Sequence, residues 1–287
     1  MSSKQNIMPV AGILSGALVW GLIWYPFRLL QGWGISGSWA TLISYVVAMG
    51  CGVYFLPRAW RELSTTKWWG VLLILSAGWA NFGYVLAMLH GEVMRVLLLF
   101  YLAPLWTILF SYWLLDERLN RYGYPVIALS LSGAFVMLWE PTRGMPYPQN
   151  ISEWLGLSAG IGFSLSNVLS RRAINLGVAT KSFSIWFGTA LLTAPLLFWQ
   201  GTVPVIGAQA ALMMVLIGVL LFATSFAVQY GVTHLPANRA MLLFLFELVI
   251  AAVAAYFLAE EAMALRDWVG AALIISASLM SGKLSDV

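Results

Sequence analysis

Long apolar runs, separated by short polar turns, follow one another along almost the whole chain. Because a helix needs about 20 apolar residues to cross a hydrocarbon core of about 30 Å, this pattern predicts an all-α polytopic membrane protein. The ten predicted transmembrane helices cover residues 9–30, 37–57, 68–89, 94–115, 121–139, 152–171, 181–200, 207–233, 237–259 and 265–283. The first run lacks an A-x-A-like cleavage site and is followed by many similar runs, so we predict a first span there and no signal peptide.

One segment of the first half returns in the second half. Residues 90–117 reappear 144 positions later as residues 234–261. Extended without gaps to residues 132 and 276, the two copies share eleven identities. These are His90/His234, Arg95/Arg239, Leu98/Leu242, Leu99/Leu243, Phe100/Phe244, Tyr112/Tyr256, Leu114/Leu258, Glu117/Glu261, Ala128/Ala272, Leu129/Leu273 and Ser132/Ser276. Leucine matches arise easily between apolar helices, but matched histidine, arginine and glutamate residues indicate a tandem duplication.

The longest polar connection, residues 140–153, carries three prolines and falls between the fifth and sixth predicted spans. We therefore predict a first repeat at 1–140, a periplasmic linker at 141–150 and a second repeat at 151–287.

Basic residues set the predicted orientation, because cytoplasmic loops are enriched in lysine and arginine. With a cytoplasmic N-terminus, eleven basic residues lie inside and four lie outside, so both termini are expected in the cytoplasm. Each half has five predicted spans, an odd number, so the second half enters from the opposite face as an inverted repeat. Inverted repeats are typical of secondary transporters, whose substrate site lies near the midplane between the two halves.

Composition agrees with a membrane protein, since 61% of residues are hydrophobic and 9% are charged, against about 25% charged in soluble domains. The pI of 9.3 could indicate nucleic acid, but the basic residues are confined to short loops, so the bilayer is the expected partner. The single Cys51 excludes a disulfide framework and a cysteine-based metal site. Without metal-ligand spacing, a nucleophile elbow or a phosphate loop, the chain is expected to be no enzyme and to use no cofactor or metal.

Four aromatic residues inside predicted spans are candidates for lining a cavity. Trp20 and Trp24 are one helical turn apart, and Trp79 and Tyr84 share the third span. Tryptophans at span ends form an interfacial belt, whereas these residues lie deeper. The alternative is that they pack against neighbouring helices.

Polar side chains at membrane depth usually face a cavity or one another. Asn81, Ser164, Asn167 and Gln229 lie within the third, sixth and eighth predicted spans. We therefore predict a mixed polar and aromatic cavity that suits zwitterionic or amphipathic solutes. Interhelical hydrogen bonds that hold the bundle together are the alternative for each residue.

Glu247 is the only formal charge deep inside any predicted span, and its repeat mate is Ala103. Burying a carboxylate in a membrane helix costs several kcal/mol. We therefore expect Glu247 to bind a substrate amino group or to carry a proton, with a structural pairing as the alternative.

Arginine and glutamate mark the two ends of the repeated span. Arg95 precedes Glu117, and Arg239 precedes Glu261, by 22 residues, roughly 33 Å of helical rise. If the fourth and ninth spans pack antiparallel, Arg95 would pair with Glu261, and Arg239 with Glu117. The alternative is that all four residues anchor helix ends. Pro104, near the middle of the fourth span, is expected to kink that helix and to act as a hinge.

Two five-span halves, with a basic turn after the sixth span and a histidine at both repeated junctions, resemble the ten-helix EamA-type exporters of the drug/metabolite transporter (DMT) superfamily. Residues 101–110, YLAPLWTILF, and Trp20 are similar to the YddG aromatic amino-acid exporters within that superfamily. This resemblance implies that Trp20 and Tyr101 lie at the substrate site. Ala103 and Ser164 stand where that group has aromatic residues, which implies a roomier and less aromatic site.

The predicted function is export of amino acids, aromatic or broadly neutral, and of related metabolites by alternating access. A monomer in the bacterial inner membrane is expected. Multidrug efflux is one alternative, although small multidrug relatives use a carboxylate in the first helix and this first helix has none. A membrane subunit that transports nothing is the other.

Overall fold

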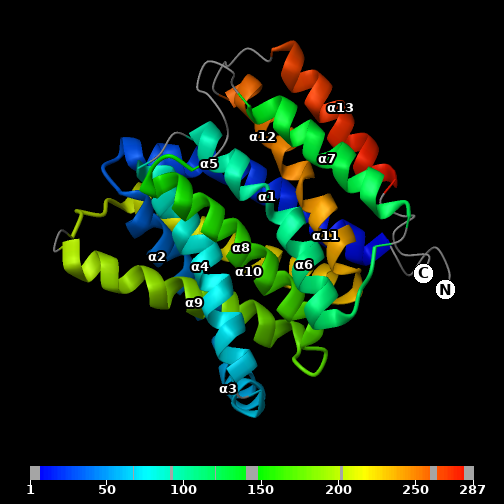
Figure 1. Cartoon of the computed structure of the whole chain (residues 1–287). Coiled ribbons are helices and arrows are strands. Elements are labelled where there is room, and N and C mark those ends of the chain that lie inside the picture. Colours follow the sequence, from blue (N-terminus) through cyan, green and yellow to red (C-terminus); the bar gives the residue numbers. More distant parts are fainter. Residues whose placement is uncertain are drawn as a thin grey trace.

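The computed structural model describes residues 7–66, 68–90, 93–119, 121–139, 148–200, 203–258 and 264–280, and all regular structure in these ranges is helical. The elements in Figure 1 are α1 (Ile7–Gly32), α2 (Gly37–Cys51), the 3-10 turn η2 (Val53–Phe55), α3 (Leu56–Thr65), α4 (Trp68–His90), α5 (Val93–Phe100), α6 (Ala103–Leu115), α7 (Gly123–Leu138), α8 (Ile151–Arg172), α9 (Val178–Gln200), α10 (Ala208–His234), α11 (Ala237–Phe244), α12 (Phe246–Leu258) and α13 (Leu265–Met280). Every predicted span contains at least one helix, so the all-α prediction is confirmed.

Length and hydropathy single out five segments that could each cross a membrane. They are Ile7–Gly32, Trp68–Met88, Val178–Trp199, Ala208–His234 and Ala237–Leu258. α2 and the segment that follows it qualify together as a pair bent by 62°, and α6, α7 and α13 contain shorter apolar stretches. α8 is absent from these groups because serine, glycine and asparagine lower its hydropathy. The chain is a multi-pass helical protein, and ten crossings stay a prediction.

The second predicted span, 37–57, was wrong at its end. α2 stops at Cys51, and α3 starts after a short 3-10 turn with Pro57 in its first helical turn. Proline fits there because the N–H that it lacks has no partner at a helix start. α3 carries Arg58 and Glu62 and is strongly amphipathic, as is typical of a helix at a membrane surface. We therefore place α3 outside the span.

Helices of the first half pack against helices of the second half in matching pairs. α1 and α8 are repeat mates, as are α4 and α10, and α1 packs along α10 just as α4 packs along α8. α2 packs on its own mate, α9, and α7 packs on its mate α13, beside which it runs antiparallel (Figure 1). The two repeats therefore form one interleaved bundle.

Glycine allows two of these crossings to be unusually close. A Cβ atom on Gly160 of α8 would lie 2.4 Å from the carbonyl oxygen of Phe100, and one on Gly12 of α1 would lie 2.2 Å from that of Ala227. Any larger side chain would push the helices apart. Small residues at crossings are typical of membrane bundles, where van der Waals packing drives helix association.

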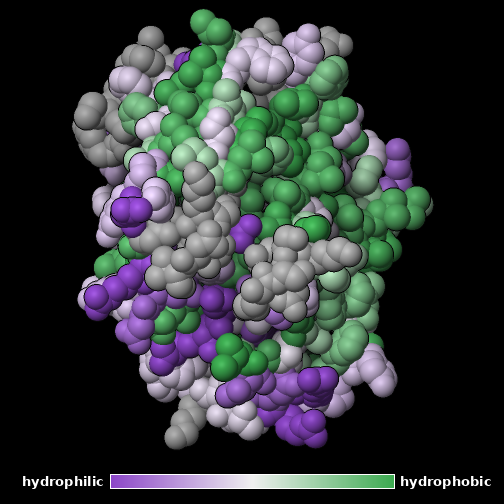
Figure 2. Space-filling view, turned by 90° about the vertical axis from the view of Figure 1, so that its right-hand side faces the viewer, coloured by the Kyte–Doolittle hydropathy of each residue, from purple (hydrophilic) through white to green (hydrophobic). Residues whose placement is uncertain are grey.

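Much of the outer surface is apolar. Figure 2 shows one face of the molecule, on which hydrophobic side chains cover the upper part and hydrophilic ones gather toward the lower end. Elsewhere Phe198, Trp199 and Val205 are almost fully exposed. Monomeric soluble proteins rarely expose large apolar patches, so this surface suits contact with lipid.

Candidate functional site

In the fourth and ninth predicted spans the regular helix is interrupted at the same position of the repeat. α5 ends at Phe100 and α6 begins at Ala103, while α11 ends at Phe244 and α12 begins at Phe246. Phe100 and Phe244 are repeat mates, 144 residues apart. Broken helices of this kind commonly form the substrate and ion sites of secondary transporters.

Proline accounts for one break but not for the other. Pro104 stands in the first turn of α6, where it cannot donate to the carbonyl of Phe100 and disfavours helical backbone in the residue before it. Two turn residues, Tyr101 and Leu102, interrupt the helix here, and action of Pro104 as a kink and hinge stays a prediction. No proline lies between Ala237 and Leu258. The second break, at Leu245, was therefore missed, and its only sequence signal was the repeat itself.

Ser164 of α8 contacts the start of α6. Its buried hydroxyl lies 2.7 Å from the carbonyl oxygen of Ala103 and 3.0 Å from that of Gly160, so it can donate to either. The contact with Ala103 ties α8 to the first turn after the break. Contact between Ser164 and a substrate stays a prediction.

Six aromatic side chains form a continuous row between the two breaks. We call this set of side chains the aromatic row. It consists of Trp20, Phe244, Phe163, Phe100, Tyr84 and Tyr101. Successive ring centroids along its first part, from Trp20 to Phe100, are 6.0, 5.1 and 5.5 Å apart. Phe100 then contacts Tyr84 at 5.1 Å and Tyr101 at 5.3 Å. The row therefore joins helices of both repeats.

Glu247 lies in the first turn of α12, directly after the second break. Its carboxyl group is hydrogen-bonded to the hydroxyl of Tyr101, and the phenol of Tyr84 interacts with it electrostatically. The described contacts of this carboxyl group include no lysine or arginine. A carboxylate is favoured here because the N-terminal end of a helix is positive. One carboxyl group thus stands at the end of the aromatic row.

α1 approaches the backbone of Glu247 closely. A Cβ atom on Gly21 would lie 3.0 Å from the backbone oxygen of Glu247 and 2.9 Å from Ile250. Trp20, beside Gly21, therefore lies near the start of α12, while Trp24 packs edge-on against the neighbouring Tyr25. Contact of either tryptophan with a substrate stays a prediction.

Two other predicted lining residues have partners on neighbouring helices. The indole N–H of Trp79 donates to the hydroxyl of Ser158 at 3.2 Å, and the hydroxyl of Tyr45 donates to Asn81 at 2.6 Å. These contacts match the alternative of interhelical bonding. They place Trp79 between α4 and α8, and Asn81 between α4 and α2.

Asn167 and Gln229 are both buried. Among the described residues, the Nδ2 atom of Asn167 and the Oε1 atom of Gln229 have no hydrogen-bond partner. Unpaired buried polar atoms are rare in proteins and call for an explanation. Both residues therefore stay candidates for substrate contact.

The three phenylalanines of the aromatic row were missed by the sequence reasoning. Phenylalanine gives no distinctive signal in an apolar span, so Phe163 could not have been found. Phe100 and Phe244 had one signal, their identity in the two copies of the repeat.

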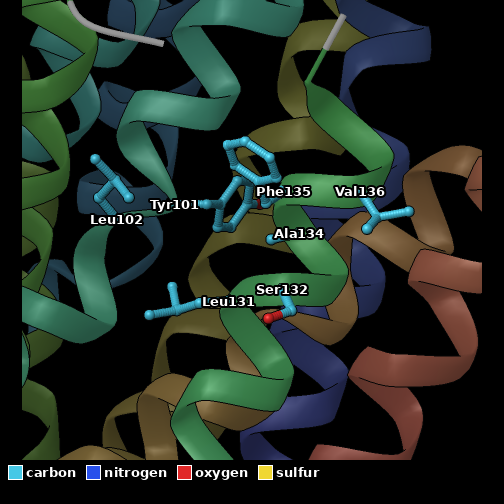
Figure 3. Close-up of a pocket in the computed structure, with 7 residues that line it drawn as sticks. All are labelled: Tyr101, Leu102, Leu131, Ser132, Ala134, Phe135 and Val136. Atoms are coloured by element: carbon cyan, nitrogen blue, oxygen red, sulfur yellow. The ribbon is translucent and has the colours of Figure 1, made fainter. Parts of the chain in front are cut away.

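A pocket of about 430 Å³ opens beside the first break. Figure 3 shows that its lining comes from two segments, Tyr101 and Leu102 at the break, and Leu131, Ser132, Ala134, Phe135 and Val136 of α7. Tyr101 therefore takes part both in this pocket and in the hydrogen bond to Glu247.

A polar cluster joins the two repeats near the ends of α6, α8 and α10 and the starts of α9 and α11. The carboxylate of Glu117 pairs with Arg171 and accepts a hydrogen bond from the backbone N–H of Ala237 at 3.0 Å. Arg171 also donates to the carbonyl of Thr233 at 3.2 Å, and the ammonium group of Lys181 donates to the Thr233 hydroxyl at 2.9 Å. The cluster therefore links residues of both repeats at this end of the bundle.

Glu117 has one partner that spacing did not suggest. The predicted partner was Arg239, and the structure shows an ion pair between Glu117 and Arg171 of α8. A pairing that includes Arg239 stays a prediction. The side chain of Arg95, and all of Glu261, lie outside the described residues, so the second predicted pair also stays a prediction.

Glu62 of α3 makes another link between the repeats. Its carboxylate accepts hydrogen bonds from the backbone N–H of Gly177 at 2.8 Å, the hydroxyl of Thr180 at 2.6 Å and the guanidinium of Arg58 at 2.6 Å. Partial burial raises the pKa of the Glu62 carboxyl, but these hydrogen bonds together lower it further, so that its pKa lies below the ordinary value. Glu62 thereby anchors α3 to the start of α9.

Comparisons with known proteins agree with a two-repeat architecture. The sequence model of the EamA-like transporter family matches residues 7–139 and 150–282. The uncharacterised transporter YojE of Bacillus subtilis is 25% identical over 179 residues, which are 58% of this chain and 58% of that protein. An uncharacterised transporter of Archaeoglobus fulgidus is 28% identical over 204 residues, 69% of this chain and 70% of that protein. Another, of Pseudomonas aeruginosa, is 23% identical over 197 residues, 65% of this chain and 62% of that protein.

The chain thus spans less than two thirds of the length of the Bacillus and Pseudomonas relatives. A solved crystal structure of a protein superposes on all of this chain, over its own full length, with a TM-score of 0.78 at 17% identity, which shows a shared fold. Because the family model matches both halves of the sequence, this chain belongs to the EamA-like transporter family of the DMT superfamily.

Proposed function

We propose that this transporter exports amino acids, aromatic or broadly neutral, and related metabolites by alternating access between two inverted repeats. The observation that carries the proposal is the carboxyl group of Glu247. It stands at a helix break, hydrogen-bonded to Tyr101 and adjoining the aromatic row.

The carboxyl group of Glu247 suits a substrate ammonium group. A carboxylate has about four lone-pair positions, and the Tyr101 hydroxyl uses one of them. Burial of a carboxylate without a cation costs several kcal/mol. A bound ammonium group would offset part of this cost and would receive charge-assisted hydrogen bonds in return.

The aromatic row suits the remainder of such a substrate. Its rings offer apolar faces, and each aromatic pair of favourable geometry contributes about 0.5–1.5 kcal/mol beyond the buried area. Aromatic faces also attract cations. Phosphorylated substrates fit less well, because the described contacts of Glu247 include no basic residue.

The polar cluster supports alternating access. It joins the repeats through Glu117 and Arg171 at the end of the bundle that also carries Arg172 and Lys181. By the preference of basic residues for the cytoplasmic side, we assign this end to the cytoplasm. Both termini are then cytoplasmic, and this conformation is closed toward the inside. We propose that the protein works as a monomer in the bacterial inner membrane.

Efflux of amphipathic drugs is the second candidate function. The observation that favours it is the pocket beside Tyr101, whose lining is mostly apolar. A transporter of this kind would accept cationic dyes as readily as amino acids.

Counterflow of labelled amino acids in proteoliposomes, with and without a pH gradient, tests the proposal. We expect saturable exchange of neutral amino acids, and a stimulation by the pH gradient if Glu247 carries a proton. Glu247→Gln should lower exchange about tenfold to a hundredfold, because hydrogen bonds to charged groups contribute about 1.5–3 kcal/mol.

Asp116→Asn is the matched control. Asp116 is an exposed carboxylate with a positive φ of 56°, a conformation that asparagine also tolerates, so this variant should transport as wild type does. Normal transport by Glu247→Gln at every pH would refute the assigned role of Glu247. Exchange of cationic dyes but of no amino acid would favour the second candidate function.

A further inference from the structure

The pocket beside the first helix break is lined by Tyr101, whose hydroxyl is hydrogen-bonded to Glu247. Its volume of about 430 Å³ falls within the range of about 300–1,000 Å³ that is typical of small-molecule sites. Apart from the hydroxyl groups of Tyr101 and Ser132, the side chains that line it are apolar. An apolar space of this size suits a hydrocarbon or aromatic group.

Tyr101 connects this pocket to the carboxyl group. Its ring lines the pocket, together with Leu102 and with Leu131 and Phe135 of α7 (Figure 3). Its hydroxyl is hydrogen-bonded to Glu247. Tyr101 is therefore shared by the pocket and by the group that would bind a substrate amine.

We propose that this pocket binds the apolar side chain of the transported amine and limits the size of that side chain. This inference rests on the proposed function, in which Glu247 binds the amino group. Charge complementarity favours an amine over a lipid acyl chain as the occupant, because the acyl chain offers no cation to the adjoining carboxyl group.

Leu131 is the position at which the pocket is best altered. It is half-buried and lines the pocket from α7. Leu131→Trp fills the space, and Leu131→Ala enlarges it. Leu129→Trp is the matched control, because Leu129 lies on the same helix and is also half-buried, but does not line the pocket.

Proteoliposome counterflow with alanine, 2-aminopentanoate, leucine and phenylalanine measures the size limit. Leu131→Trp should lower the rate ratio of phenylalanine to alanine by about tenfold or more, since a single methylene group in an apolar pocket changes discrimination by about 10–200-fold. Leu131→Ala should keep alanine exchange and maintain or raise that of phenylalanine, while Leu129→Trp should keep the wild-type ratio. An unchanged ratio in Leu131→Trp overturns the proposal, as does an equal loss for all four substrates. An unchanged ratio with a new dependence on the acyl-chain length of the vesicles would instead assign the pocket to lipid.

A second measurement separates this inference from the proposed function. If wild-type protein exchanges no amino acid, the proposed substrate class fails, and the pocket is tested by thermal stabilisation of purified protein with primary alkylamines from propylamine to octylamine. Stabilisation should increase with chain length in wild type, lose that increase in Leu131→Trp and be absent in Glu247→Gln. Stabilisation that does not depend on chain length overturns the pocket assignment.

Discussion

Replacing Gly160 with alanine tests whether the close crossing of α8 and α5 positions the aromatic row. The added Cβ atom would lie 2.4 Å from the carbonyl oxygen of Phe100 and 3.1 Å from its carbonyl carbon and Cα atoms. These are backbone atoms, which cannot turn aside as a side chain can. The helices must therefore separate by about 1 Å to reach an ordinary contact of 3.4 Å. Phe100 and Phe163, whose ring centroids are 5.5 Å apart, would separate with them.

The steric cost of Gly160→Ala can be isolated by comparison with the same substitution at a second glycine. Overpacking of a tight contact costs about 1–3 kcal/mol, while alanine in place of glycine gains about 1 kcal/mol of helix propensity. Gly50 of α2 is the control, because a Cβ atom there has nothing within 4 Å. Both variants gain the same propensity, so the difference between their free energies of unfolding, about 1–3 kcal/mol, measures the steric cost alone.

Reversible unfolding in mixed micelles, followed by tryptophan fluorescence, gives the two free energies, and counterflow gives the activity. We expect Gly160→Ala to be less stable than Gly50→Ala by this amount and to transport more slowly than wild type. Gly50→Ala should match or exceed the stability of wild type. Equal free energies of unfolding for the two variants would refute the reasoning, because the crossing would then have room for a methyl group.

The links between the repeats give two further predictions. Glu117→Gln leaves Arg171 without its ion pair, so we expect a loss of about 1–3 kcal/mol in the free energy of unfolding. We also expect a cysteine placed at Thr233 to become more accessible to a hydrophilic thiol reagent. Unchanged accessibility would argue against a closed inner end. The pKa of Glu62 is lowered in the folded protein, so its contribution to stability is present above the ordinary glutamate pKa and is lost as the pH falls through the folded-state value. Wild type should therefore lose more stability in acid than Glu62→Gln in thermal melts across the acidic range, and parallel pH profiles would contradict this.

Local signals in the sequence predicted part of the site. Pro104 predicted a discontinuity in the fourth span because proline acts on its own backbone, whatever surrounds it. Glu247 was found for a similar reason, since one carboxylate in an apolar run is visible without any knowledge of its neighbours. The break at Leu245 has no such local cause. It follows the break in the other copy, so the repeat was the better predictor at that position.

Other residues could be interpreted only with their partners in view. Trp20 and Trp79 look alike as deep tryptophans, yet one adjoins Phe244 in the aromatic row and the other donates to Ser158 between two helices. Spacing in the repeat suggested Arg239 for Glu117 but gave no sign of Arg171, which pairs with Glu117 from α8. Each outcome depends on how one helix is rotated about its axis relative to the next.

The stretch of residues 90–117 and its copy at 234–261 show which features the sequence determines and which depend on the tertiary structure. The sequence by itself determined an all-helical membrane protein, its duplication and the lone carboxylate of Glu247, because composition, hydrophobic run length and repeat identity belong to each segment separately. Only the tertiary structure decided that Tyr101 hydrogen-bonds to Glu247, that its ring lines a pocket with α7, and that Glu117 pairs with Arg171. Most of these contacts join segments far apart in the chain, and uniformly apolar helix faces do not specify which side of a helix will meet its neighbour. Close packing at small residues such as Gly160 fixes that choice.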